Sequence, residues 1–199
     1  MFVQVITGKV SDRDGIRQQL ARWVDELAPG ATGWLGSTGG VAEDGTFVAV
    51  ARFASEDAAK ANSDRPEQGA WWEQTAPNFD GEVTFLNCAQ VDTFGAGGSD
   101  DAGFVQFMQG RADRAQVAEA GPRLEALMAR ARPDVIGGII AWPGDGSFTE
   151  VAYFTSQEEA RKAESGGMSG EDAAEFGRLA SLLDVSRYID LAEPWLYSA

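Results

Sequence analysis

Hydrophobic and polar residues alternate at the start of the chain, where residues 2–8 are also rich in β-branched side chains, and this pattern predicts a strand. Between residues 16 and 27 the apolar positions recur at intervals of three and four, which predicts a helix that begins after Ser11. Two further apolar runs, 32–41 and 46–53, are separated by an Asp-Gly turn and predict a hairpin.

A second helix and a fourth strand follow the hairpin. Ser55 can cap the helix, and Pro66 interrupts it because proline lacks the amide donor that a continuing turn needs. A second helical piece covers 67–75, and the apolar stretch 82–91 predicts the last strand. The first half of the chain therefore has the predicted order β-α-β-β-α-β.

The second half repeats this pattern. Phe104-Val105-Gln106 follows Phe2-Val3-Gln4 at a spacing of 104 − 2 = 102 residues, and self-similarity over half a chain indicates an internal duplication. The predicted elements are a strand at 104–110, a helix from Asp113 with a kink at Gly121-Pro122, strands at 135–142 and 147–154, a helix capped by Ser156 and broken at Gly166-Gly167, and a strand at 185–191. We expect a first repeat at 1–94, a glycine-rich linker at 95–102 and a second repeat at 103–199.

Each half is expected to be a ferredoxin-like unit of the α+β class, with a four-stranded antiparallel sheet and helices on one face. The first strand is apolar on both sides, with Phe2 and Ile6 pointing one way and Val3 and Val5 the other. A sheet that is apolar on both faces must be covered on both. We therefore expect the two sheets to pack face to face as a barrel within one chain, either as a monomeric pseudo-dimer or as a homodimer.

Three segments carry a resemblance to a known family. They are Gly-Trp-Leu-Gly-Ser at 33–37, Gly-Thr-Phe-Val at 45–48, and Arg-Phe-Ala-Ser-Glu-Asp-Ala at 52–58. With the order of elements, they resemble the dimeric α+β barrel superfamily and, within it, the group similar to antibiotic biosynthesis monooxygenases. Single-repeat relatives form the barrel by dimerising, so this chain looks like a fused dimer.

The resemblance implies a ligand pocket between helices and sheet. It also implies cofactor-independent oxygenation of an electron-rich aromatic substrate, whose own carbanion reduces oxygen. Haem-degrading relatives use an asparagine, a tryptophan and a histidine. This chain has no histidine, which argues against haem degradation.

Composition narrows the possible partners and cofactors. The net charge of −15 disfavours nucleic acid and anionic membranes, which would repel the chain. No apolar run reaches the length of a membrane span, and the start lacks the basic region of a signal peptide, so we expect a cytoplasmic protein. The single cysteine, Cys88, is expected to be an inert buried thiol.

The missing histidine also removes the usual Ser-His-Asp and Cys-His mechanisms and the commonest transition-metal ligand. No glycine-rich nucleotide motif is present. We therefore expect no metal and no cofactor, and we expect a small molecule as the ligand.

The main candidate site is the segment 62–74, which crosses the break between the two helical pieces. It contains Asn62, Arg65, Trp71 and Trp72, residue types that the family uses to hold an aromatic substrate. The second half has small or flexible residues at the same spacing, which favours the first half as the functional one. The alternatives are that the two tryptophans, which cannot both face inward from adjacent positions, only fill the core, and that Arg65 is solvated or ion-paired.

Polar residues in the predicted strands are further candidates. Gln4, its repeat partner Gln106, and Asn87 could donate hydrogen bonds to a ligand or bond a neighbouring strand. Glu150 aligns with Ala49 and would suit a general base if burial raised its pKa; the alternative is an exposed or salt-bridged carboxylate.

The leading functional hypothesis is a cofactor-free monooxygenase acting on a small aromatic or polyketide-like molecule, with no catalytic residue assigned. The alternative is a non-catalytic ligand-binding or structural barrel, because a fold does not determine a function.

Overall fold

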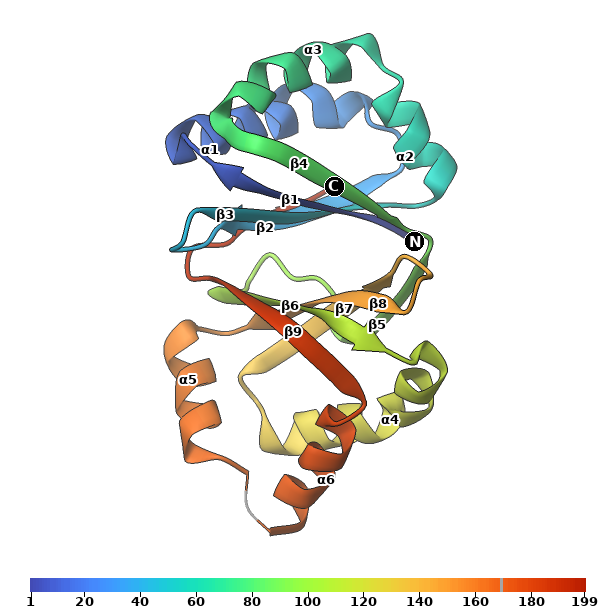
Figure 1. The fold of residues 1–199 in the computed structure, drawn as a ribbon, viewed down its shortest axis with the longest axis vertical. Coiled ribbons are helices and arrows are strands. Elements are labelled where there is room, and N and C mark those ends of the chain that lie inside the picture. Colours follow the sequence, from blue (N-terminus) through green and yellow to red (C-terminus); the bar gives the residue numbers. More distant parts are fainter. Residues whose placement is uncertain (169) are drawn as a thin grey trace. The chain divides into compact units, whose positions relative to one another are not determined.

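The structure, a computed structural model, describes residues 1–168 and 170–199. The chain divides into two compact units. The first contains Met1–Ala89 and Pro194–Ala199, and the second contains Gln90–Glu193. Within the described residues each unit has one five-stranded antiparallel sheet, with its helices on one face of that sheet (Figure 1).

The first unit has the strand order β10-β2-β3-β1-β4. Its elements are β1 (Phe2–Val10), α1 (Arg13–Arg22), a π-helical segment (Trp23–Leu27), a 3-10 turn (Ala28–Gly30), β2 (Trp34–Val41), β3 (Thr46–Phe53), α2 (Glu56–Ser63), α3 (Pro66–Thr75), a 3-10 turn (Ala76–Asn78), β4 (Phe79–Cys88) and β10 (Trp195–Ser198).

Local chemistry explains where these helices begin. The side chain of Asp12 accepts the amide of Gly15 and caps α1, so the predicted cap at Ser11 is wrong by one residue. Ser55 caps α2 as predicted, by accepting the amide of Ala58. Pro66 is the first residue of α3, where its missing amide hydrogen costs nothing.

The second unit has the strand order β5-β7-β8-β6-β9. Its elements are β5 (Gln90–Gly95), β6 (Phe104–Ala112), α4 (Arg114–Ala131), β7 (Val135–Trp142), β8 (Ser147–Phe154), α5 (Gln157–Gly166), α6 (Gly170–Ala180) and β9 (Leu183–Leu191). Asp113 and Ser156 cap α4 and α5 as predicted. The helix α4 runs on through Pro122, and Gly167 follows α5 with a φ of 63°, a conformation that favours glycine.

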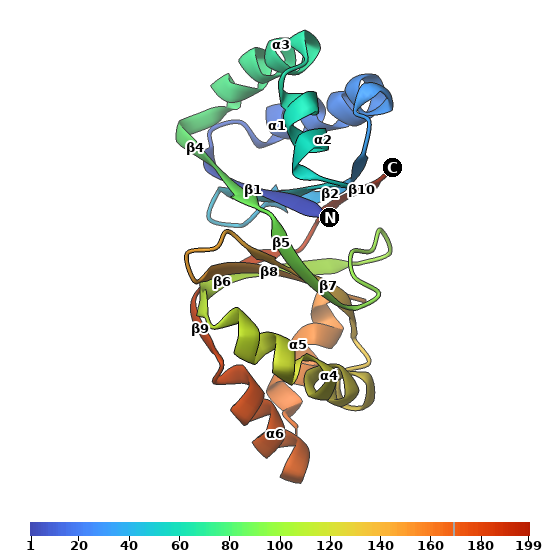
Figure 2. The ribbon, with the colours of Figure 1, turned by 90° about the vertical axis from the view of Figure 1, so that its right-hand side faces the viewer.

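Each predicted repeat contributes one strand to the sheet of the other repeat. The stretch 82–91 was expected to be one strand, but β4 ends at Cys88 and the chain continues as β5, which pairs with β7 in the second sheet. At the end of the chain, β10 pairs with β2 in the first sheet (Figure 2). Each added strand pairs with an edge that would otherwise present unpaired backbone groups.

The exchange makes the compact units differ from the predicted repeats. Residues 90–94 belong to the second unit and 194–199 to the first, and Gly95 ends a strand instead of opening a linker. The α+β class and the ferredoxin-like arrangement of strands and helices are confirmed. Packing of the two sheets on each other, and duplication as the origin of the units, stay predictions.

No helix in the described part of the chain is both long enough and apolar enough to span a membrane.

Candidate functional site

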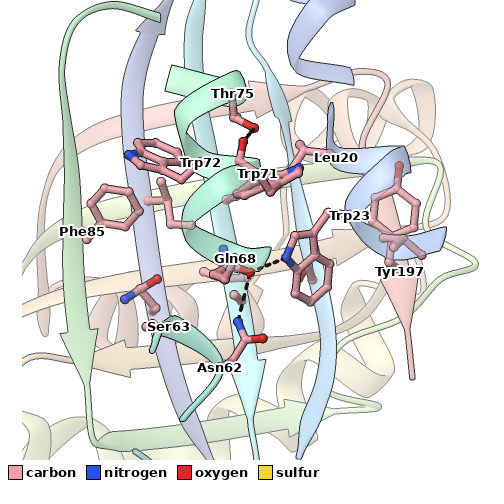
Figure 3. A pocket seen from close by; sticks show the side chains of 18 of the residues that line it. Leu20, Trp23, Asn62, Ser63, Gln68, Trp71, Trp72, Thr75, Phe85 and Tyr197 are labelled. Atoms are coloured by element: carbon pink, nitrogen blue, oxygen red, sulfur yellow. Dashed lines mark hydrogen bonds between the residues drawn. The ribbon is translucent and has the colours of Figure 1, made fainter. Parts of the chain in front are cut away.

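The first unit contains a cavity of about 440 Å³ between its sheet and its helices (Figure 3). All the residues that line it belong to this unit. Its sheet side includes Gln4, Ile6, Ser37, Gly39, Phe47, Ala49, Ala51, Phe53, Phe85, Trp195 and Tyr197, and its helical side includes Ile16, Leu20, Trp23, Val24, Ala59, Asn62, Ser63, Gln68, Gly69, Trp71, Trp72 and Thr75.

Small residues in the sheet leave room for this cavity. Gly39 lies opposite Ala49 in the pairing of β2 with β3, and a Cβ atom on Gly39 would stand only 2.6 Å from that of Ala49. At the corresponding place in the second sheet, Ile140 lies opposite Glu150, and both are buried. The second sheet therefore carries larger side chains at these two positions than the first sheet does.

Both tryptophans of α3 line the cavity. Trp71 is buried and donates its indole N–H to the carbonyl of Gln19 in α1, at 2.8 Å. Trp72 is partly buried and packs edge-on against Phe85 of β4, with ring centroids 5.2 Å apart. The expectation that adjacent tryptophans cannot both face inward is therefore wrong, since one reaches toward α1 and the other toward β4.

The opening of the cavity is marked by the lining residues that solvent reaches. Ser63, Gly69 and Phe85 are exposed, and Phe85 keeps 47% of its surface accessible. A Cβ atom on Gly69 would meet nothing within 4 Å, so α3 leaves open space here. Solvent therefore reaches part of the cavity wall on α2, α3 and β4.

Hydrogen bonds connect the predicted residues Asn62 and Arg65. The guanidinium of Arg65 donates to the carbonyl of Leu27 and to Oδ1 of Asn62, both at 3.0 Å. Asn62 in turn donates to Oε1 of Gln68 at 3.3 Å, and Trp23 donates its indole N–H to the same oxygen at 2.6 Å. Arg65 does not line the cavity and also pairs with Glu67, so it holds Asn62 in place from behind.

Gln4 lines the cavity, whereas Asn87 does not. Asn87 accepts a hydrogen bond from Nε2 of Gln4 at 3.0 Å, and Gln106 makes the equivalent bond to Asp190 in the second unit, at 2.8 Å. Both glutamines therefore bond the neighbouring outer strand, the structural alternative left open by the sequence. The side chain of Gln4 is in addition part of the cavity wall.

The cavity is electrically neutral. Among the lining residues none is Asp, Glu, Lys, Arg or Cys, and the titratable group is the phenol of Tyr197. Burial raises the pKa of Tyr197 above its usual value of 10, so the phenol stays protonated at neutral pH. The wall can donate hydrogen bonds and stack on aromatic rings, but it offers no carboxylate or amine as a base.

Glu150 lies in the second unit and is not part of this wall. The structure buries its carboxyl group, and desolvation raises its pKa from 4.5 to about 7. The exposed or salt-bridged alternative is thus wrong. No group of three or more histidine, cysteine or acidic residues in the described part of the chain could hold a metal ion.

Sequence reasoning did not single out several lining residues. Gln68 was inside the predicted segment but carried no separate signal. Trp23 lay within the apolar stripe of the predicted first helix, and Trp195 and Tyr197 follow the last predicted strand. One residue separates Trp195 from Tyr197, so both lie on the same face if this segment is a strand. This spacing is the sequence signal that could have identified them.

No known family profile matches the sequence, and no curated protein is significantly similar to it. Solved structures are similar. A proposed monooxygenase from Lactobacillus acidophilus superposes with a TM-score of 0.66 at 9% identity, over 98% of this chain and 92% of that chain. A proposed monooxygenase from Fusobacterium nucleatum gives 0.68 at 8% identity, over 99% and 91%.

An anthrone oxidase-like protein superposes with a TM-score of 0.60 at 12% identity, over 99% of this chain and 89% of that chain. The resemblance to monooxygenase-like proteins that the sequence suggested is therefore confirmed at the level of the fold. Identities this low say nothing about the substrate.

Proposed function

We propose that the first unit binds an uncharged, flat aromatic molecule in its cavity and oxygenates it without a cofactor. The observation that carries the proposal is the neutral, ring-lined cavity of about 440 Å³, which has four tryptophans in its wall. Such a wall stacks well on planar rings and gives nothing to pair with a charged ligand. The chain's charge of −15 further disfavours anions.

The fold supports the oxygenase part of the proposal, because structurally similar proteins are described as monooxygenases or as anthrone oxidase-like. Anthrone illustrates the chemistry. Its central CH₂ group loses two hydrogens and gains one oxygen atom of O₂, and the second oxygen atom leaves as water with those hydrogens. The substrate supplies all the electrons, so the reaction needs no redox cofactor.

A second candidate function is binding without catalysis. The observation that favours it is the lack of a strong base in the wall, where the one titratable group is the protonated phenol of Tyr197. An aromatic molecule without an acidic C–H bond would then stay unchanged in the cavity. Cytoplasmic location and oligomeric state remain predictions from the sequence.

Oxygen consumption with anthrone separates the two functions. We expect the protein to increase the rate of oxygen uptake above that of buffer, with one O₂ consumed and one anthraquinone formed per anthrone. Ligand binding is followed in parallel by quenching of tryptophan fluorescence, since five of the six tryptophans lie in the first unit. Quenching without oxygen uptake would leave the binding function and refute the oxygenase.

A further inference from the structure

We propose that Gln68 is the specificity-determining residue of this cavity and that it selects aromatic ligands carrying a carbonyl oxygen. This inference rests on the proposed function, because it names the class of molecule that the first unit would bind. It follows from the direction in which a chain of hydrogen bonds must run.

The two ends of the chain can only donate. The indole N–H of Trp23 has no acceptor atom, so the Gln68 atom that lies 2.6 Å from it must be the amide oxygen. The guanidinium of Arg65 also only donates, so the Asn62 atom that lies 3.0 Å from it is the amide oxygen. The Asn62 amide nitrogen then faces Gln68 and donates to its oxygen.

Both amides are therefore oriented from opposite ends, and neither can turn over without bringing two donors together. The Arg65 end is anchored by its bond to the carbonyl of Leu27, and its side chain is only 18% exposed. Figure 3 shows Trp23 and Asn62 converging on Gln68. The oxygen of Gln68 is thus fully used.

The amide nitrogen of Gln68 is left with two N–H groups. No described residue accepts a hydrogen bond from it, and Gln68 is part of the cavity wall. A ligand that fills the cavity with an apolar surface would leave this donor dry and unpaired, which is unfavourable. A ligand with a carbonyl oxygen at this position would satisfy it.

The pair formed by Gln4 and Asn87 does not select in the same way. Both members are amides, and neither is held by a donor-only group in a hydrogen bond of the described structure. The pair can turn over together and present either an oxygen or a nitrogen to the cavity. The directional preference therefore belongs to Gln68.

Fluorenone and fluorene test the proposal, because they are flat, uncharged and similar in shape, and only fluorenone has a carbonyl group. The dissociation constants of both are measured by fluorescence quenching for the wild type and for Gln68→Met, which keeps the length of the side chain and removes the donor. We expect the variant to lose about tenfold in affinity for fluorenone relative to fluorene. Comparing the ratio between proteins cancels the different water solubilities of the ligands.

Two further variants complete the test. Gln18→Met, on the exposed side of α1, makes the same replacement outside the cavity and should leave the ratio unchanged. Trp23→Phe keeps a ring but removes the shorter of the two hydrogen bonds that orient Gln68, leaving only the 3.3 Å bond from Asn62, so the preference for fluorenone should fall. This variant keeps the proposal testable even if Gln68→Met does not fold.

If Gln68→Met weakens the binding of fluorenone and fluorene equally, the ratio of their dissociation constants does not change. That result would overturn the role of Gln68 but not the proposal that the cavity binds aromatic ligands. If neither ligand binds the wild type, the proposed function fails as well.

Discussion

Replacing Trp71 with alanine is expected to lower the free energy of unfolding of the first unit by about 3–5 kcal/mol and to abolish aromatic ligand binding. The indole ring is buried in a cluster with Trp23, Leu27 and Phe53. It also links α3 to α1 through its hydrogen bond to the carbonyl of Gln19. Its removal enlarges a cavity that is already present and leaves that carbonyl without its donor.

Trp71→Phe is the matched variant. It keeps a ring in the cluster and loses the hydrogen bond, so we expect a cost of about 1 kcal/mol and ligand binding that is weakened but measurable. Chemical denaturation followed by circular dichroism gives the stabilities, and quenching by fluorenone gives the affinities. Equal stability of Trp71→Ala and the wild type would show that the ring does not hold α3 in place.

Replacing Glu150 with methionine is expected to change the free energy of unfolding of the second unit in a way that depends on pH. The change should be more stabilising at pH 8 than at pH 4, by about 3 kcal/mol. Burial raises the pKa of this carboxyl group from 4.5 to about 7, so the folded protein holds a proton that the unfolded chain has released. The contribution of this group to the stability of the wild type is therefore fully present below pH 4.5. It falls as the pH rises toward 7 and does not change further above pH 7.

The methionine variant has no carboxyl group at this position and should lack this part of the pH dependence. Glu119→Met removes an exposed carboxylate from α4 and serves as the control. Denaturation of the three proteins at pH 4, 6 and 8 gives the comparison. Parallel pH profiles for the wild type and Glu150→Met would mean that the carboxyl group reaches water in solution.

Much of the secondary structure was predictable because local patterns determine it. The strands β3, β7 and β8 have the predicted bounds, since each is a short apolar run that begins or ends next to an Asp-Gly turn. The caps at Ser55 and Ser156 follow from one side chain accepting an amide three residues later. These features depend on neighbours in the sequence.

The exchange of β5 and β10 was not predictable in this way. An apolar strand carries no local sign of which sheet edge it joins, and β10 pairs with β2 across more than 150 residues of chain. The cavity wall depends on that pairing, because Trp195 and Tyr197 reach the first unit on β10. Their contribution could only be found from the tertiary structure.

The segment that contains the candidate site was predictable from the sequence, but the orientation of its side chains was not. Asn62, Trp71 and Trp72 stand out by residue type, and all three line the cavity. The orientation of Gln68 depends on donors from two other elements, Trp23 after α1 and Asn62 in α2. The hydrogen bonds among these three residues together determine which polar groups can still bond a ligand.

On the function proposed above, one cavity, in the first unit, holds the aromatic ligand. Ala51 lines this cavity on β3, and Ala51→Phe would place a ring inside it where the ligand binds, whereas Ala70→Phe places the same ring on the exposed side of α3. The decisive measurement is a fluorenone titration of the wild type and both variants. We predict one ligand per chain for the wild type and Ala70→Phe and no saturable binding to a folded Ala51→Phe. Binding to Ala51→Phe with wild-type affinity would show that the ligand does not occupy this cavity.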